Sequence, residues 1–203
     1  MFTGVLPQIR INPKQRSYLF AILGVVGLYQ LTSGLWIFVK AHVAQYLIAS
    51  AWQATLLDQQ AHRPWSWADT YPVAELSIGA QHWYVLAGAN GRNLAFGPTH
   101  LSASPLPGER GNTVIVGHRD TQFNSLKTLK NKDTIKVAHL NGSTTYQVTD
   151  RQIIPAALLG TSTLLNQEQF IQPSLTLITC YPFDSITPNP SLRFVVNAVK
   201  IGD

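Results

Sequence analysis

Charged residues are scarce in this chain of 203 residues, since Asp, Glu, Lys and Arg make up 12% of it, against roughly 25% in a usual globular domain. The hydrophobic share of 45% excludes an intrinsically disordered protein, because disorder requires low hydrophobicity and high net charge. Cysteine is almost absent. The single cysteine excludes a disulfide framework within the chain and a cysteine-rich zinc site. The length allows one ordinary domain with an appendage.

Acidic residues are missing from residues 1–40, which carry four basic ones: Arg10, Lys14, Arg16 and Lys40. Residues 41–203 carry eleven Lys or Arg and ten Asp or Glu. The net charge of +5 therefore lies almost entirely at the N-terminal end. Because a nucleic-acid-binding protein presents a basic patch on its folded domain, this distribution argues against nucleic acid as a partner.

Residues 18–39 form a run of 22 residues without charge. A helix of that length reaches ~33 Å, enough to cross the hydrocarbon core of a bilayer. A cleaved signal peptide has a shorter apolar core of about 7–15 residues, so we favour a retained transmembrane anchor, with a buried core helix as the weaker alternative. Basic residues precede the run, and the positive-inside rule then places residues 1–17 in the cytoplasm and the chain beyond residue 40 outside it.

Residues 40–72 are expected to form a juxtamembrane helix and a linker. Apolar residues recur every three or four positions between residues 43 and 56, which predicts a helix with one apolar face that packs on the following domain or at the membrane interface. The segment 63–72 contains two prolines and two tryptophans and is expected to be irregular. Trp65 and Trp67 suit either the membrane surface or the edge of the domain.

From residue 73 onward, short runs rich in Val, Ile, Thr and aromatic residues alternate with turn residues, which is typical of β-strands. The predicted strands cover residues 73–78, 82–87, 113–117, 134–140, 143–149, 174–179 and 192–201. Asn141-Gly142 is a strong hairpin signal between two of them. Short helical turns are expected near residues 93–96, 121–129 and 156–159. Residues 73–203 are thus predicted to be a mainly β domain, a closed or nearly closed barrel with seven or eight strands.

Cys180 is the first candidate for a catalytic residue. It follows the predicted strand 174–179 and directly precedes Tyr181 and Pro182, so its thiol is expected to face a loop, as a nucleophile would. A free cysteine is also often a small buried hydrophobic residue. Its position alone therefore leaves both interpretations open.

His118 and Arg193 also lie at strand ends. His118 follows the predicted strand 113–117, and imidazole is the usual proton carrier for a catalytic thiol near neutral pH. If Arg193 opens a strand antiparallel to the one before Cys180, the joined strand ends meet at one edge of the sheet. A guanidinium there can stabilise the oxyanion of an acyl-transfer intermediate. Each residue alone also has a plainer interpretation, as a histidine at a strand end or a surface arginine.

Together these residues resemble the sortase family. Thr176-Leu-Ile-Thr-Cys180 matches the Thr-Leu-x-Thr-Cys motif of sortases, and the spacing to Arg193 and the upstream segment 112–118 agree with it. The resemblance runs from residue 64 to residue 201 and is strongest to the single-anchor sortases of Gram-negative bacteria. It implies the family's closed eight-stranded β-barrel with short helices, preceded by an N-terminal transmembrane helix, with no metal and no organic cofactor. It also implies a single-pass protein of the bacterial inner membrane whose catalytic domain, residues 73–203, lies on the periplasmic side.

The resemblance implies a cysteine transpeptidase. In such an enzyme the thiolate of Cys180 attacks a carbonyl of a Leu-Pro-x-Thr-Gly-like sorting signal on an exported protein. His118 protonates the leaving amine and later takes the proton of the incoming one, and Arg193 binds the signal and the oxyanion. The acyl group passes to an amine acceptor at the cell envelope. Thr179 either contacts the substrate or is an ordinary strand residue, and Asp120 either orients His118 or is, as we favour, a solvated turn residue.

Two other functions stay open at this point. One is a non-catalytic membrane-anchored β-domain that binds a partner, and the other is a related exported cysteine peptidase that only hydrolyses. An L,D-transpeptidase is disfavoured because its usual motif has Arg two residues after the cysteine, where this chain has Pro182. A papain-like protease is disfavoured because its cysteine precedes its histidine.

Overall fold

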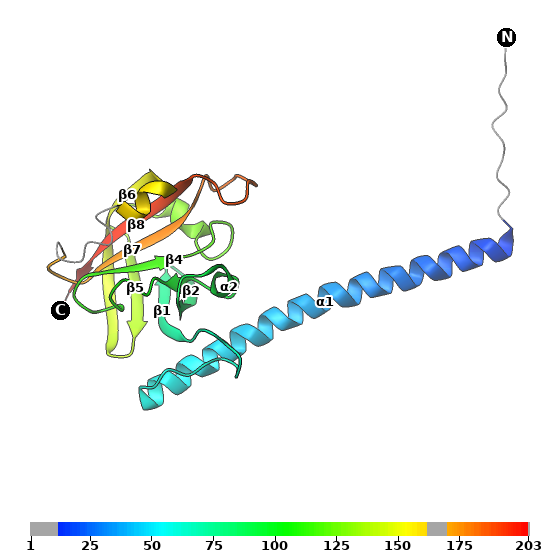
Figure 1. Ribbon diagram of the computed structural model, residues 1–203, viewed down its shortest axis with the longest axis horizontal. Coiled ribbons are helices and arrows are strands. Elements are labelled where there is room, and N and C mark those ends of the chain that lie inside the picture. The colour runs from blue at the N-terminus through cyan, green and yellow to red at the C-terminus, as the bar shows by residue number, and fades with distance from the viewer. Residues whose placement is uncertain (1–11, 162–169, 203) are drawn as a thin grey trace, which may run out of the picture. The chain divides into compact units, whose positions relative to one another are not determined.

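The structure consists of a long helix and a β-barrel (Figure 1). It is a computed structural model that describes residues 12–161 and 170–202. The chain divides into two compact units, one that ends at Val43 and one that begins at Ala44.

Helix α1 (Pro13–Asp58) contains the predicted transmembrane run. The large apolar side chains between residues 18 and 39 are exposed, with Tyr18 at 70% and Leu31 at 74%. Soluble proteins rarely leave so large a contiguous apolar surface open to water. The helix is long and apolar enough to cross a membrane, which is compatible with the predicted single-pass anchor.

The C-terminal part of α1, residues 44–58, belongs to the unit that contains the barrel. Ile48, Trp52 and Thr55 are buried, at the spacing of three and four residues that brings side chains to one face of a helix. Gln45 also donates a hydrogen bond from Nε2 to the carbonyl of Phe96 at 2.7 Å. The predicted helix with one apolar face that packs on the domain is therefore confirmed.

The segment between α1 and the first strand is irregular, as predicted. The ring of Trp65 packs against the ring of Phe96, with 5.1 Å between their centroids, so this tryptophan covers the edge of the domain. Trp67, in contrast, is 83% exposed.

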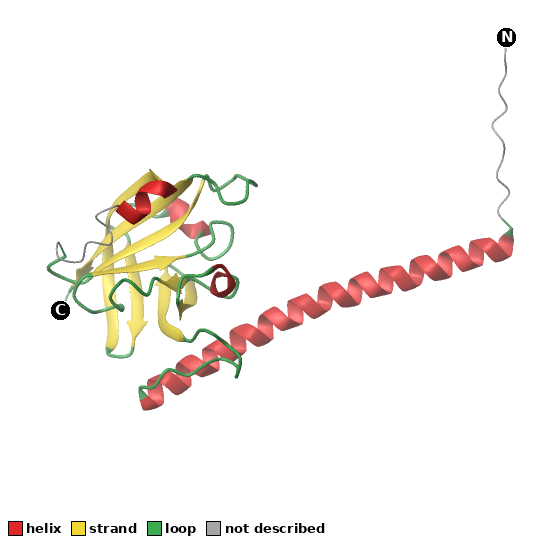
Figure 2. Ribbon diagram, in the orientation of Figure 1, coloured by secondary structure: helices red, strands yellow, loops and turns green. Residues whose placement is uncertain are grey.

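Within the residues that the structure describes, eight strands close into a barrel, with three short helices in the connections (Figure 2). The strands are β1 (Pro72–Ile78), β2 (Gln81–Ala87), β3 (Thr99–His100), β4 (Asn112–Val116), β5 (Thr134–His139), β6 (Gly142–Pro155), β7 (Ser174–Tyr181) and β8 (Leu192–Ile201). The short helices are α2 (Gly91–Leu94) and the 3-10 helices η1 (Asn124–Thr128) and η2 (Ala156–Thr161). Around the barrel the strands follow the order β1-β2-β3-β4-β7-β8-β6-β5. The predicted fold class is confirmed.

The barrel interior is filled by alternate side chains of the strands. In β1, for example, Ala74, Leu76 and Ile78 are buried while the residues between them are partly exposed. This alternation follows from the two-residue period of a strand, which turns successive side chains to opposite faces. Burying one such Leu or Ile side chain contributes roughly 1.5–3 kcal/mol. The barrel is therefore a packed core whose strand ends, rather than its interior, are available for function.

Two features of the sheet differ from the sequence prediction. The strand predicted for residues 143–149 continues as β6 to Pro155, because β8 pairs along it beyond a bulge between Val148 and Asp150. Strand β3 has no counterpart among the predicted strands. Its two residues are too few to show alternation, and only their pairing with β2 and β4 defines them as a strand.

Candidate active site

Three strand ends meet at one edge of the barrel. Strand β4 pairs in parallel with β7, and Val116 is the partner of Ile178, so His118 and Cys180 each lie two residues beyond this pair. Strand β8 pairs antiparallel with β7, and Arg193 is the direct partner of Cys180. The predicted antiparallel arrangement of the strands that carry Cys180 and Arg193 is confirmed.

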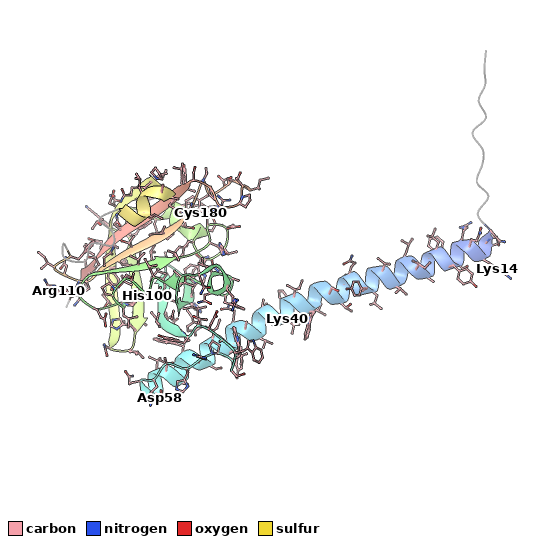
Figure 3. All side chains as sticks on the ribbon, viewed as in Figure 1. Lys14, Lys40, Asp58, His100, Arg110 and Cys180 are labelled. Atoms are coloured by element: carbon pink, nitrogen blue, oxygen red, sulfur yellow. The ribbon has the colours of Figure 1, made fainter. Side chains whose placement is uncertain are left out.

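A pocket of about 540 Å³ opens at this edge, and its lining includes Cys180, His118 and Arg193. One wall is formed by residues 186–190 of the loop between β7 and β8. Leu94 and Leu159 add apolar surface. Figure 3 marks Cys180 near the end of β7. The barrel thus brings the three candidate catalytic residues into one concave site.

His118 stands on a turn whose backbone is fixed from both sides. Its N–H donates to Oε1 of Gln122 at 3.0 Å, and its carbonyl accepts from the N–H of Phe123 at 2.9 Å. The preceding Gly117 allows this turn to form, because a Cβ there would lie 2.8 Å from the ring of Phe123. The side chain of His118 is exposed and forms no hydrogen bond with any residue that the structure describes. The imidazole therefore lines the pocket, and neither ring nitrogen has a partner among the described residues.

Cys180 is the only cysteine of the chain, and its side chain is partly exposed. Beside it the rings of Tyr181, Phe183 and Phe194 pack together, with centroids 5.2 to 6.3 Å apart. Aromatic contacts of this kind stabilise the strand ends beyond the area they bury. No hydrogen bond involves the thiol within the described part of the chain. The sulfur is thus held on a rigid strand end and is open to the pocket.

Arg193 uses part of its guanidinium to hold the loop. Its Nη1 donates to the carbonyls of Pro190 and Leu192, and its Nη2 donates to Oδ1 of Asn189 at 3.0 Å. A guanidinium has five N–H donors, so two of those of Arg193 have no partner in the part of the chain that the structure describes. The same side chain can therefore fix the loop and offer donors to a ligand.

The two remaining candidates, Thr179 and Asp120, have different surroundings. Thr179 is 2% exposed, and its hydroxyl donates to the carbonyl of Gly117 at 2.7 Å, which ties β7 to the turn before His118. Asp120 is exposed and lines the pocket, but it forms no hydrogen bond with His118. Among residues 12–161 and 170–202, no three His, Cys, Asp or Glu side chains gather as metal ligands would.

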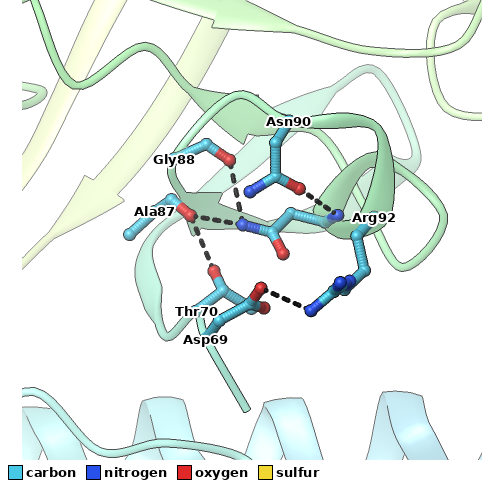
Figure 4. Close-up of polar contacts among 7 residues, drawn as sticks. Asp69, Thr70, Ala87, Gly88, Asn90 and Arg92 are labelled. Carbon is cyan, nitrogen blue, oxygen red and sulfur yellow. Dashed lines mark hydrogen bonds and ion pairs between the residues drawn. The ribbon is translucent and has the colours of Figure 1, made fainter.

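Helix α2 places Leu94 at the rim of the pocket, and a small polar network fixes it (Figure 4). Asn90 caps the helix by accepting from the N–H of Asn93 at 2.9 Å. Asn93 Nδ2 in turn donates to the carbonyls of Ala87 and Gly88, both at 3.0 Å. This side of the site is thereby attached to the end of β2.

Two residues that no sequence pattern singled out also shape the site. Gln122 donates from Nε2 to the carbonyl of Leu94 at 3.3 Å, so it links the turn of His118 to the rim of the pocket. Arg119 is buried and bonded to the loop between β7 and β8. Both look like ordinary polar turn residues in the sequence, because their partners lie far away along the chain.

Comparison with known proteins agrees with this architecture. The sortase domain family matches residues 76–201. Sortase D of Bacillus subtilis (strain 168) is 28% identical over 117 residues, which are 58% of this chain. The chain spans little more than half the length of this curated relative, since the match covers 57% of it.

Two solved structures share the fold. A sortase D5 transpeptidase of Clostridium perfringens has a TM-score of 0.62 at 20% identity, over 79% of this chain and 99% of that one. Sortase A from Corynebacterium diphtheriae has a TM-score of 0.57 at 23% identity, over 79% of this chain and 85% of that one. At these identities the likeness concerns the fold alone.

Proposed function

Because the chain belongs to the sortase family, we propose that it is a membrane-anchored cysteine transpeptidase. It cleaves a Leu-Pro-x-Thr-Gly-like sorting signal of an exported protein and transfers the acyl group to an amine at the cell envelope. The observation that carries the proposal is the pocket that Cys180, His118 and Arg193 line together. A thiol nucleophile, an imidazole acid–base and a guanidinium anion donor can together carry acyl transfer from a peptide.

The proposed reaction has two halves. In the first, the Cys180 thiolate attacks the signal's carbonyl, and the C–N bond breaks as the His118 imidazolium gives its proton to the leaving amine. This leaves a thioester on Cys180 and a neutral imidazole. In the second, the acceptor amine attacks the thioester and passes a proton to His118, which restores the thiolate and the imidazolium. No oxidant and no cofactor enters the balance.

Arg193 has the role of an anion-binding group in this scheme. The tetrahedral intermediate of each half carries a negative oxygen, and two N–H donors of Arg193 are not used by the loop. Its place directly opposite Cys180 in the sheet supports this role. A guanidinium also presents parallel donors, which an ammonium does not.

The proposed arrangement in the cell is based on helix α1 and on the charges that flank its apolar run. Residues 1–17 lie in the cytoplasm, residues 18–39 cross the inner membrane, residues 40–72 form the juxtamembrane helix and linker, and residues 73–203 form the periplasmic catalytic domain. The basic residues before Tyr18 and the apolar side chains of the following run support this orientation. The narrower likeness to single-anchor sortases of Gram-negative bacteria is part of the same proposal.

The reaction class is tested by the fate of the acyl-enzyme. The full chain in detergent is incubated with a Leu-Pro-x-Thr-Gly-like peptide, with and without hydroxylamine or a short amino-peptide, and the products are identified by mass spectrometry. We expect slow hydrolysis in water and diversion to the hydroxamate or the ligated peptide with amine. The acid as sole product at high amine concentration would make the protein a peptidase. If the wild type does not cleave the peptide, either the proposed sorting signal or the proposed enzymatic activity is wrong.

The sidedness is tested through the single thiol. Because the chain has one cysteine, a membrane-impermeant maleimide reports Cys180 alone. In spheroplasts we expect labelling of the wild type without lysis and none of Cys180→Ala. Labelling that requires lysis would place the catalytic domain in the cytoplasm.

A further inference from the structure

Arg119 is a buried arginine between two exposed neighbours. It is 8% exposed, whereas His118 and Asp120 on either side of it are exposed. Arginine is rarely buried without a partner, because removing its charge from water is costly. The hydrogen-bond partners of the Arg119 side chain therefore indicate its role.

Among the described residues, all hydrogen bonds of this guanidinium go to the loop between β7 and β8. Nη1 donates to the carbonyl of Pro182 at 2.9 Å, and Nη2 donates to the carbonyls of Ser185 and Thr187, the latter at 3.0 Å. No ion pair involves Arg119 in the part of the chain that the structure describes. The charge is compensated by carbonyl dipoles of a single loop, and hydrogen bonds from a charged donor are stronger than neutral ones.

Apart from the ring of Phe183, which packs against Tyr181 and Phe194, the first half of this loop has few other contacts among the described residues. Residues 182, 188 and 190 are prolines and lack an N–H. Besides Arg119, the first half has a bond of 3.4 Å from Ser185 N–H to the carbonyl of Pro182 and one of 3.1 Å from Thr187 N–H to Oγ of Ser185. Arg193 holds only the second half, from residue 189 to residue 192. The two arginines therefore divide the loop between them.

The same loop forms a wall of the pocket, and the turn that carries Arg119 also carries His118. Ile186, Thr187 and Pro188 line the pocket, and Thr187 is bonded to Arg119. The backbone of His118 is fixed through Gln122 and Phe123. One turn thus positions the imidazole and, through the next side chain, the wall that faces it.

We propose that Arg119 is a positioning residue that holds the first half of this loop, and with it the pocket wall at residues 186–188, at a set distance from His118 and thereby determines how tightly the peptide is bound. The kinetic part of this inference rests on the proposed function. Arg119 also lines the pocket, but its Nη donors are bonded to carbonyls of the loop, so we expect its loss to act through the loop. The expected signature is a raised KM with a kcat that changes much less.

The experiment compares Arg119→Met, Arg119→Lys and Arg151→Met with the wild type, each as the full chain in detergent. Methionine keeps the apolar length of the side chain without a hydrogen-bond donor. Lysine keeps a charged donor, and this variant tests the inference if the methionine variant does not fold. Arg151→Met is the matched control, because Arg151 also donates to a carbonyl, that of Leu129, but is not in the pocket. Hydrogen exchange of residues 183–191 is measured beside peptide kinetics.

We expect amide exchange in the loop and the KM for the peptide to rise about tenfold or more in Arg119→Met, the scale of lost hydrogen bonds to a charged donor. The kcat of Arg119→Met should stay within about threefold of the wild-type value. The loop exchange and the KM of Arg119→Lys should lie between those of the wild type and Arg119→Met. Arg151→Met should leave loop exchange and KM unchanged. Unaltered loop exchange in Arg119→Met would overturn the inference, as would faster exchange throughout the barrel. A fall in kcat alone would overturn it too.

A wild type that never converts the peptide would count against the proposed function and not against Arg119. In that case loop exchange and the alkylation rate of Cys180 by iodoacetamide decide the inference. A wall released from its position should expose the thiol, so alkylation should be faster in Arg119→Met than in Arg151→Met. Equal rates together with equal loop exchange would overturn it.

Discussion

A histidine at each end of the β-barrel is held in a different way. At the hairpin end, where β5 turns into β6, Nε2 of His139 lies 3.0 Å from Oγ1 of Thr144, and the hydroxyl of Tyr146 accepts from the N–H of Gly108 at 3.1 Å. At the pocket end, the imidazole of His118 and the thiol of Cys180 have no hydrogen-bond partner in residues 12–161 and 170–202.

This difference separates polar groups that support the fold from groups that are available to a ligand. At the hairpin end, burial lowers the pKa of His139, against a smaller opposing effect of Glu109. Burial likewise raises the pKa of Tyr146, although its hydrogen bonds to Gly108 and Thr144 act the other way. Both groups are thereby favoured in their neutral forms and bonded within the chain. Substitutions at the two ends should therefore affect different properties.

The largest effect should come from Cys180→Ala. Without the thiol no thioester forms, so peptide turnover should fall by about 10⁴-fold or more. Mass spectrometry of the enzyme mixed with peptide should show an acyl adduct on the wild type and none on the variant. Turnover that survives this substitution would remove Cys180 from the mechanism.

The two histidines give the sharpest comparison between the ends. His118→Ala should lose roughly 10²–10⁴-fold in turnover, the usual contribution of a general acid–base. His139→Gln should retain nearly all of it. The wild-type rate should be bell-shaped in pH, because the thiolate must form while His118 keeps its proton. A rate that rises steadily with pH and is indifferent to His118→Ala would contradict its role.

Arg193 should show that geometry matters beyond charge. Arg193→Ala should lose about 10²–10³-fold in kcat, the scale for one oxyanion donor. Arg193→Lys should lose less but still much, because an ammonium cannot replace two parallel donors. Steady-state kinetics with the same peptide measures both. Near-normal turnover of the alanine variant would refute the assignment.

Two glycines, one at each end, should separate stability from activity. A Cβ at Gly117 would lie 2.8 Å from the ring of Phe123, and one at Gly108, where φ is +88°, would lie 2.5 Å from the ring of His139. Each alanine variant should be destabilised by about 1–3 kcal/mol, as overpacked sites are. Only Gly117→Ala should also lower turnover, since it displaces the turn of His118. Denaturant unfolding measures the stability of each variant, and peptide kinetics measures its turnover. An equal loss of turnover in both variants would contradict the comparison.

The smallest effect concerns pH and stability. The pKa of His139 is lowered from its ordinary value of 6.5, so the unfolded chain takes up this proton at a higher pH than the folded one. Stability is therefore fully present above that ordinary value and is lost as the pH falls toward the lowered one. Thermal unfolding of the wild type should shift downward over this window, and His139→Gln should reduce the shift. An identical pH profile for the two would exclude His139 as a contributor.

Much of the fold follows from local patterns. The uncharged run of residues 18–39 is helical, and the runs predicted at residues 73–78, 134–140 and 192–201 are strands with nearly the predicted bounds. These patterns repeat every two or every three to four residues, so they are visible within short windows. The extension of β6 to Pro155 is not visible in such a window. Charged residues and a proline there favour the end of a strand, whereas pairing with β8 continues it.

The site was predicted only in part, for the same reason. Cys180 and Arg193 could be paired because one short loop joins their strands. The place of His118 depends on the parallel pairing of β4 with β7, whose partners are about 60 residues apart, as Val116 and Ile178 are. The local sequence around Arg119 resembles a solvated turn, and only the distant loop explains its burial.

The sequence by itself determined the apolar run of residues 18–39, most of the strands and the motif that ends in Cys180, since each depends on residues close together in the chain. The tertiary structure alone decided the closure of the barrel, the pocket shared by Cys180, His118 and Arg193, and the bonding of Arg119 to the loop. These contacts join residues far apart in sequence. Their formation depends on chain closure and on the packing of the whole core, which no local periodicity encodes.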